Sequence, residues 1–121
     1  MGLDLSLELD VGHISVTHNL GRMASHIPAG SRDVYVTDAM VWKDVTLYEI
    51  MWRPEEVGIY DGGTLLPHLQ RALDYMLPRE EELKEYSPDN GWGTYEGLLK
   101  AVREMGQHCA MFPHASLRSC R

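Results

Sequence analysis

The sequence predicts an α+β fold in which a small antiparallel sheet packs against two main helices. Apolar and polar residues alternate over residues 3–10, as in a half-buried strand. Two later segments instead carry apolar residues at steps of three and four, which is typical of amphipathic helices. Strand patterns come first, helical patterns follow, and residues 115–121 again resemble a strand. We therefore expect strands and helices in separate layers, with the N-terminal hairpin and the C-terminal strand forming the sheet.

The N-terminal hairpin is predicted from a second alternating segment. Gly12 follows the first strand, and residues 13–18 then alternate again with Ile14 and Val16 on one face. By the same alternation His18 shares that face. We therefore expect its imidazole to point toward the interior or the floor of a pocket.

A turn and two more strand-like segments come next. Asn19 is a favourable N-cap, which predicts a short helix over residues 20–25. Pro, Gly and Ser then indicate a loop over residues 28–31. Residues 34–37 have strand character, and residues 39–42 continue that strand or return beside it.

The next helix is predicted from Asp44 to about Trp52. Asp44 is a suitable cap, and Pro54 ends the helix because the residue before a proline leaves the α region. Tyr48 and Arg53 lie in or just after this predicted helix.

The two main helices are predicted to begin at Thr64 and Thr94, each of which is a good N-cap. Pro78 ends the first helix and Pro113 ends the second. Between them, the glutamates of residues 79–86 predict a short solvated helix.

Composition excludes several classes of protein. The 121 residues include 11 Lys+Arg and 18 Asp+Glu, a net charge of −7, which argues against a nucleic-acid-binding groove. No apolar run approaches the roughly 20 residues of a membrane span, and no cationic leader precedes an apolar block. We therefore expect a cytoplasmic protein without nucleic-acid or membrane partners. The two cysteines match no zinc-binding spacing, so neither a metal site nor a cofactor is predicted.

Signatures of the common enzyme classes are missing from the sequence. It contains no phosphate-binding glycine loop, no His-Glu-x-x-His, no nucleophile elbow and no Cys-x-x-Cys. No catalytic residue is assigned on this basis, and a binding protein is favoured over an enzyme.

Three clusters at turns or helix ends supply candidate ligand-binding residues, because binding groups concentrate at such places. An imidazole, amides and an arginine could meet the polar parts of a ligand, and aromatic rings could stack on a base. The candidates are His18, Asn19, Tyr48, Arg53, Asn90, Trp92 and Tyr95.

Structural explanations compete with this reading. Asn19 could simply cap a helix while His18 is a hydrogen-bonded core histidine. Arg53 could stabilise a helix C-terminus. Trp92, between two glycines, is either a core side chain or a binding surface.

The same clusters carry a family resemblance. Residues 17–24 (THNLGRMA), 48–56 (YEIMWRPEE) and 90–98 (NGWGTYEGL) resemble blocks of a family of small uncharacterised bacteriophage and actinobacterial proteins. Members of that family begin with an acidic alternating strand and end on a strand closing with Ser-Arg. The length of the chain predicts one α+β domain over residues 1–121. Relative to members of that family, residues 27–45 are an inserted segment.

Three functions follow from these observations. The first is a phage-type accessory protein that binds, and sequesters, a small polar nucleotide-like ligand such as a host-defence signal, with the site at a boundary of a homo-oligomer. The second is an acidic inhibitor that occupies a basic surface of a host protein, using the glutamates of residues 80–85. The third is a small hydrolase in which His18 and Glu49 form an acid–base pair.

Overall fold

The computed structural model describes residues 2–8 and 12–121, and it has an α+β fold. The last two residues of the strand predicted over 3–10 lie outside the described residues. The strands are β1 (Gly2–Leu7), β2 (Gly12–Thr17), β3 (Pro28–Val36), β4 (Ala39–Thr46) and β5 (Leu117–Cys120). The helices are α1 (Gly21–Ala24), α2 (Leu47–Trp52), α3 (Gly62–Met76), α4 (Glu80–Lys84) and α5 (Tyr95–Met111), with short 3-10 helices η2 (His18–Leu20), η3 (Pro54–Val57) and η4 (Leu77–Arg79).

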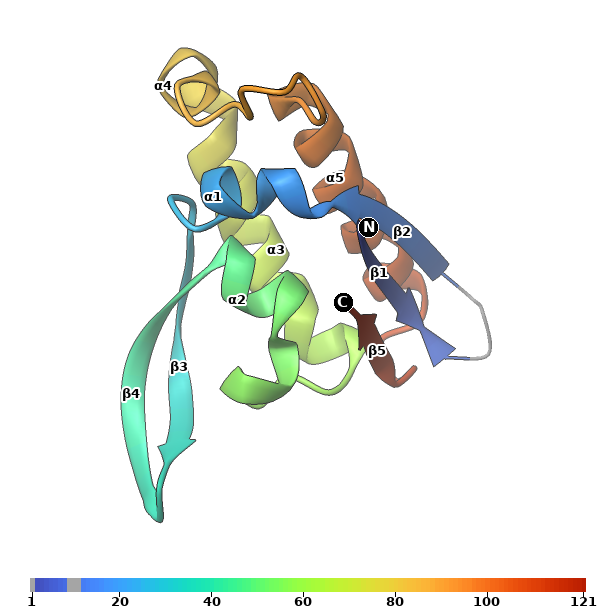
Figure 1. The fold of residues 1–121 in the computed structure, drawn as a ribbon. Helices are drawn as coiled ribbons and strands as arrows, with labels where there is room; N and C mark the ends of the chain where they lie inside the picture. The colour runs from blue at the N-terminus through green and yellow to red at the C-terminus, as the bar shows by residue number, and fades with distance from the viewer. Residues whose placement is uncertain (1, 9–11) are drawn as a thin grey trace.

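The main sheet confirms the predicted layers. Its strand order is β2-β1-β5, and all neighbours are antiparallel. The alternating leucines of β1 are fully buried on one face, as are Ile14 and Val16 of β2 to within a few per cent. Helix α5 packs on β2, helix α3 packs on α5, and helix α2 contacts β1 and β5 (Figure 1). We call this sheet with its covering helices the body.

The helix starts correct three of the predicted caps. Thr17 rather than Asn19 caps the first of them, η2, and its side chain accepts from the Asn19 backbone N–H. Helix α2 is capped by Thr46, which forms a capping box with Glu49, whereas Asp44 lies within β4 and accepts a hydrogen bond from Ser31. Helix α3 is capped by Asp61, which accepts from the Thr64 backbone N–H at 2.8 Å. Several residues that favour the N-cap position lie close together before α2 and before α3, so the local sequence alone does not select among them.

The predicted start of α5 is confirmed. The Thr94 side chain caps this helix by accepting from the Gly97 backbone N–H at 3.0 Å. The predicted solvated helix is present as α4, and the predicted closing strand is present as β5.

Strands β3 and β4 form a separate two-stranded antiparallel sheet that projects away from the body (Figure 1). Of the two alternatives left open for residues 39–42, the structure shows the return beside the first strand. The predicted loop over 28–31 is instead the first part of β3. The two strands are joined at Thr37 and Asp38, and Thr37 has a positive φ of 59°. Among the described residues, no helix is both long and apolar enough to cross a membrane.

Candidate functional site

His18 does not occupy the interior position predicted for it. Strand β2 ends at Thr17, and His18 begins the 3-10 helix η2, so the strand alternation no longer determines its direction. The residue is exposed, but its Nδ1 accepts a hydrogen bond from Trp52 Nε1 at 3.0 Å. Because Nδ1 is the acceptor, the neutral imidazole carries its proton on Nε2.

Tyr48 and Arg53 belong to the same cluster as Trp52. The rings of Tyr48 and Trp52 stack with centroids 5.4 Å apart, and Arg53 Nε donates to Tyr48 Oη at 3.5 Å. Arg53 also pairs with Glu56 at 2.9 Å. The hydrogen bond to Tyr48 and the pairing with Glu56 raise the pKa of Arg53 above its ordinary value. Its guanidinium is therefore already engaged within the chain.

The proposed acid–base pair of His18 and Glu49 does not form among the described residues. Glu49 accepts hydrogen bonds from the backbone and side chain of Thr46 and is paired with Lys43. His18 instead contacts Trp52. Each side chain thus has a structural partner of its own.

The third cluster separates into a core residue and an exposed one. Tyr95 is buried, and its hydroxyl donates to the Met76 carbonyl at 2.7 Å, so it does not offer a stacking surface to a ligand. Burial raises the pKa of this phenol. Trp92 is 71% exposed, so it is not a core side chain. Asn90 Oδ1 accepts from the Trp92 backbone N–H at 2.9 Å and thereby shapes the turn.

The three clusters nevertheless meet in space. Gly93, with a φ of 110°, lies so close to η2 that a Cβ there would stand 2.8 Å from side-chain atoms of both Thr17 and Leu20. The η2 turn therefore contacts Gly93 through Leu20 and contacts Trp52 through His18. Asn19 lies on the same turn and donates to Thr17 Oγ1 at 3.3 Å. These contacts join residues of the chain to one another. Four cavities of the described structure are lined by other residues.

A groove runs along the base of the β3–β4 hairpin, beside α3. It consists of two adjoining cavities of about 510 Å³ and 360 Å³, and Arg71 lines both of them. Arg71 is exposed and forms no ion pair within the described part of the chain. We call this feature the basal groove; its lining comprises Pro28, Gly30, Ser31, Trp42, Asp44, Pro67, His68, Arg71, Asp74 and Tyr75.

His68 attaches the base of the hairpin to α3. This buried imidazole donates from Nδ1 to the Ala29 carbonyl at 2.6 Å and accepts at Nε2 from Arg32 Nη1 at 3.3 Å. Arg32 also donates from Nη2 to the Gly58 carbonyl at 3.1 Å. Burial, together with the charges of Arg32 and Arg71, lowers the pKa of His68. The base of the hairpin is thus held by a defined polar clamp.

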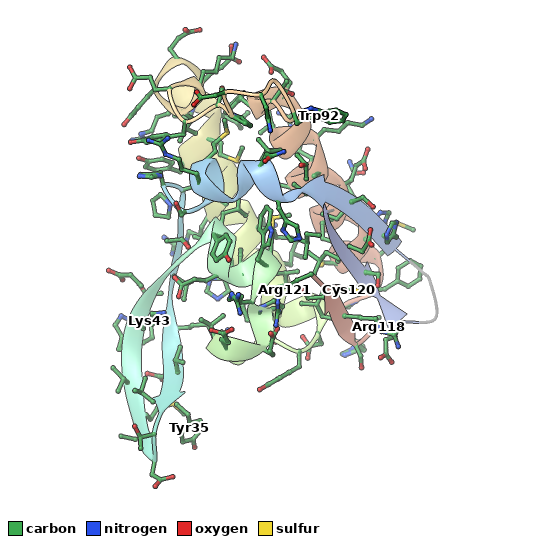
Figure 2. The ribbon with its side chains drawn as sticks, in the orientation of Figure 1. Tyr35, Lys43, Trp92, Arg118, Cys120 and Arg121 are labelled. Atoms are coloured by element: carbon green, nitrogen blue, oxygen red, sulfur yellow. The ribbon has the colours of Figure 1, made fainter. Side chains whose placement is uncertain are left out.

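Beyond this clamp, the hairpin exposes large apolar side chains. We call residues 32–44 the arm. Tyr35 is 72% exposed, Trp42 67% and Met40 54%, and the strand register places all three on one face. Val36 and Val41 are exposed on the opposite face. Figure 2 shows Tyr35 near the free end of the arm, far from Trp92 at the other end of the molecule.

The arm was not predicted as a functional surface from the sequence. Its signal was present in residues 34–36 and 39–42, which are apolar on both faces instead of alternating. Such runs are ordinary in a strand covered on both faces. Only the structure shows that Val34 alone of these residues is buried, while residues 35–36 and 39–42 stay exposed.

Carboxylates outnumber cations on the arm, which carries Asp33, Asp38 and Asp44 against Arg32 and Lys43. Arg32 is held by His68 and Gly58, and Lys43 is folded back onto Glu49. Asp33 and Asp38 are exposed and form no ion pair among residues 2–8 and 12–121. The arm therefore combines aromatic side chains with negative charge.

A serine, an aspartate and a histidine meet on the outer face of the main sheet, but in an order that does not support nucleophilic catalysis. Asp4 Oδ1 accepts from Ser15 Oγ at 2.7 Å and contacts His13 Nε2 at 3.3 Å. These bonds lower the pKa of Asp4. Activation of a serine requires the imidazole beside the hydroxyl, and here the carboxylate lies between them. Within the described residues, no group of three or more His, Cys, Asp or Glu side chains could hold a metal ion.

The arm and the basal groove both offer surface or space to another molecule. Two further cavities are present, one of about 480 Å³ beside Met111 and Phe112 and one of about 400 Å³ lined by the arm and by residues 55–60. Comparison with known proteins gives no counterpart for the arm or the basal groove. Neither a protein-family model, nor a curated protein, nor a solved structure matches the chain.

Proposed function

We propose that this chain is an acidic protein-interaction module whose arm binds a partner protein. The observation that supports this function is the exposed cluster of Tyr35, Met40 and Trp42 on a projecting hairpin. Contiguous exposed apolar patches are uncommon on monomeric proteins and often mark binding surfaces. Tyr, Trp and Met are also enriched in the buried centres of interfaces.

The shape of the arm favours a partner with a cleft. Val36 and Val41 are exposed on one face while Tyr35 and Trp42 are exposed on the other. A flat surface would cover only one of these faces, whereas a cleft would cover both. Since an isolated two-stranded hairpin is only marginally stable in water, the cleft would also stabilise the arm.

The charge of the arm favours a basic partner. Asp33 and Asp38 lie beside the apolar side chains, and the whole chain has a net charge of −7. Opposite charge on the partner would accelerate the encounter and disfavour neutral competitors. The acidic run over residues 80–85 has no aromatic side chain, so we place the interface on the arm rather than on α4. The resemblance to phage proteins makes a bacterial host protein the first partner to test.

A matched pair of variants tests this function. The tagged chain is incubated with host lysate, and a stoichiometric complex is isolated by size-exclusion chromatography with light scattering. We expect the complex to disappear with Tyr35→Ser/Trp42→Ser and to persist with Trp92→Ser, which removes an equally exposed aromatic residue elsewhere. A complex that survives the arm variant, or one lost equally with Trp92→Ser, would contradict the proposal.

Small-ligand binding is a second candidate, supported by the basal groove rather than by the clusters identified in the sequence. Arg71 offers an unpaired guanidinium to both cavities, and the exposed Trp42 lines one of them. An arginine binds phosphate or carboxylate, and an indole ring stacks on a base. A nucleotide-like ligand would therefore fit this groove better than the packed cluster around His18.

Isothermal titration calorimetry with cyclic and ADP-ribose-type nucleotides tests the second candidate. Binding in the groove should be lost with Arg71→Ala and retained with Arg53→Ala. Tyr35→Ser should leave the ligand affinity unchanged, because Tyr35 lines neither groove cavity. Absence of heat at tens of micromolar protein with every nucleotide, or loss with Arg53→Ala alone, would exclude the groove.

A further inference from the structure

Strand β4 has an unpaired edge. Within the described chain β4 pairs with β3 on one side only, because these two strands form their own sheet. Residues 39–44 are all exposed, and they pair with β3 in a regular register. Half of the backbone N–H and C=O groups of such a strand point away from its partner, toward the open edge.

The edge of β4 lacks the usual protection against strand pairing. Natural edge strands are blocked by prolines, bulges or charged side chains. Strand β3 has such features, namely Pro28 and a register irregularity between Pro28 and Ser31, and it also contacts α3. Over residues 39–44, β4 has neither a proline nor a bulge. Of its two charged side chains, Lys43 is folded back onto Glu49, and Asp44 accepts a hydrogen bond from Ser31 of β3.

We infer that residues 39–44 of β4 bind an extended segment of the partner protein as a third strand, in which basic and apolar side chains alternate. This inference rests on the proposed protein-interaction function and specifies its mode. Addition of a strand to an open sheet edge is a recurrent way of binding extended peptides, in which backbone hydrogen bonds provide affinity and alternate side chains provide specificity.

The two faces of β4 determine the side chains of the added strand. One face carries Met40, Trp42 and Asp44, so a lysine or arginine beside them would meet a carboxylate and an indole ring. The opposite face carries Ala39, Val41 and Lys43. Lys43 is folded back onto Glu49, so an apolar side chain of the added strand would cover the exposed Val41. A strand with alternating Lys and Val satisfies both faces at once.

A second copy of the chain is a poorer occupant of this edge. Pairing β4 with β4 of another copy would bring together two arms in which Asp33, Asp38 and Asp44 form no ion pair among the described residues. Each copy also has a net charge of −7. Like charges placed opposite one another disfavour the association.

The experiment uses the full-length, isotope-labelled chain and the synthetic peptide Lys-Val-Lys-Val-Lys-Val-Lys. Amide hydrogen exchange is followed by NMR with and without the peptide. We expect alternate amides of residues 39–44 to exchange about tenfold more slowly with the peptide, while the amides that pair β3 with β4 change little. The protection should vanish when the central valine of the peptide is replaced by proline, which removes a backbone donor. It should also be at least about tenfold weaker when every lysine is replaced by glutamate.

Three results would overturn the inference. Peptide binding that shifts side-chain signals of Trp42 without protecting β4 amides would indicate docking on the face of the arm. Equal protection by the proline-containing peptide would exclude strand pairing. Equal protection by the glutamate-containing peptide would exclude selection by charge. Protection that appears without peptide and increases with protein concentration would identify a second copy as the occupant.

The proposed function has a separate readout. If a partner complex still depends on Tyr35 and Trp42 while β4 amides stay unprotected, the mode of binding is wrong and the interaction function stands. If Tyr35→Ser/Trp42→Ser leaves that complex intact, the interaction function itself fails.

Discussion

The body and the arm contain similar apolar residues and use them in opposite ways. In β1, Leu3, Leu5 and Leu7 are completely buried beneath the helices. In the arm, Tyr35 and Trp42 each expose more than half of their side-chain surface. Burial in the body stabilises the folded chain through the apolar area removed from water, whereas exposure in the arm forgoes that gain. The arm therefore has a composition suited to binding rather than to folding.

The largest expected effect is in the body. Leu5→Ala should lower the free energy of unfolding by about 3 kcal/mol, because it leaves a cavity in the central strand of the main sheet. Trp42→Ala should change it by less than about 0.5 kcal/mol, although it removes a larger side chain. Urea unfolding followed by circular dichroism measures both. Comparable losses for the two variants would show that the arm belongs to the core.

A smaller loss is expected for a buried hydrogen bond of the body. Tyr95→Phe removes the hydroxyl that donates to the Met76 carbonyl and should cost about 1 kcal/mol of unfolding free energy. The control is Tyr60→Phe, since the Tyr60 hydroxyl is at the surface and its bond to the Glu55 carbonyl is long, at 3.4 Å. Thermal melts of the two variants provide the test. If Tyr60→Phe lowers the melting temperature as much as Tyr95→Phe does, the hydroxyl of Tyr95 has no special role.

The boundary between the two regions should respond to pH. The pKa of His68 is lowered in the folded chain, so on acidification the unfolded state takes up a proton first. The stabilisation from His68 is therefore complete above its unfolded pKa of about 6.5 and declines as the pH falls below that value. Protonation would also turn the nitrogen that accepts from Arg32 into a donor and place two cations together. We expect amide exchange at the base of the hairpin to accelerate below about pH 6.

A neutral variant separates this effect from other titrations. His68→Gln should abolish the pH dependence at the base of the hairpin, and amides of β1 should not change in the same range. Asp4 and Asp61 have lowered pKa values, so their contributions are lost only in more acidic solution. A pH response that persists in His68→Gln would assign the effect to another group.

The smallest effect is expected at Trp92. Trp92→Ala should alter the unfolding free energy by less than about 0.5 kcal/mol, because the indole ring is exposed and its turn is formed by the Asn90 side chain. Asn90→Ala, which removes that side chain, should cost more than Trp92→Ala. A large loss of unfolding free energy in Trp92→Ala would show that Trp92 packs as a core residue.

The body was largely predictable from the sequence because the apolar residues that recur at strand or helix spacing there are also the buried ones. The alternating leucines of β1 and the helical stripes of α3 and α5 lie on single faces, and each face is buried. The exact helix starts were less predictable. Thr46 and Asp44 both cap helices well, and only the pairing of Asp44 within β4 decides between them.

The candidate site was predicted less well, because local patterns do not report what covers a residue. Tyr95 and Trp92 lie three residues apart in one predicted cluster, yet one is buried beneath α3 residues and the other is exposed. His18 was predicted from the alternation of β2, but this strand ends at Thr17, so the alternation does not extend to His18. The arm was not identified because apolar runs with and without a covering layer look alike in sequence.

The pairing of β1 with β5 has a consequence for the order of folding. It joins Asp4 to Cys120, so the main sheet is complete only after segments from opposite ends of the sequence have met. Such distant pairings form slowly, whereas a hairpin with a short turn closes within microseconds. The turn of β3–β4 involves only Thr37 and Asp38. The arm can thus form while the body is still incomplete, and a partner present during synthesis could bind a nascent chain before its sheet closes.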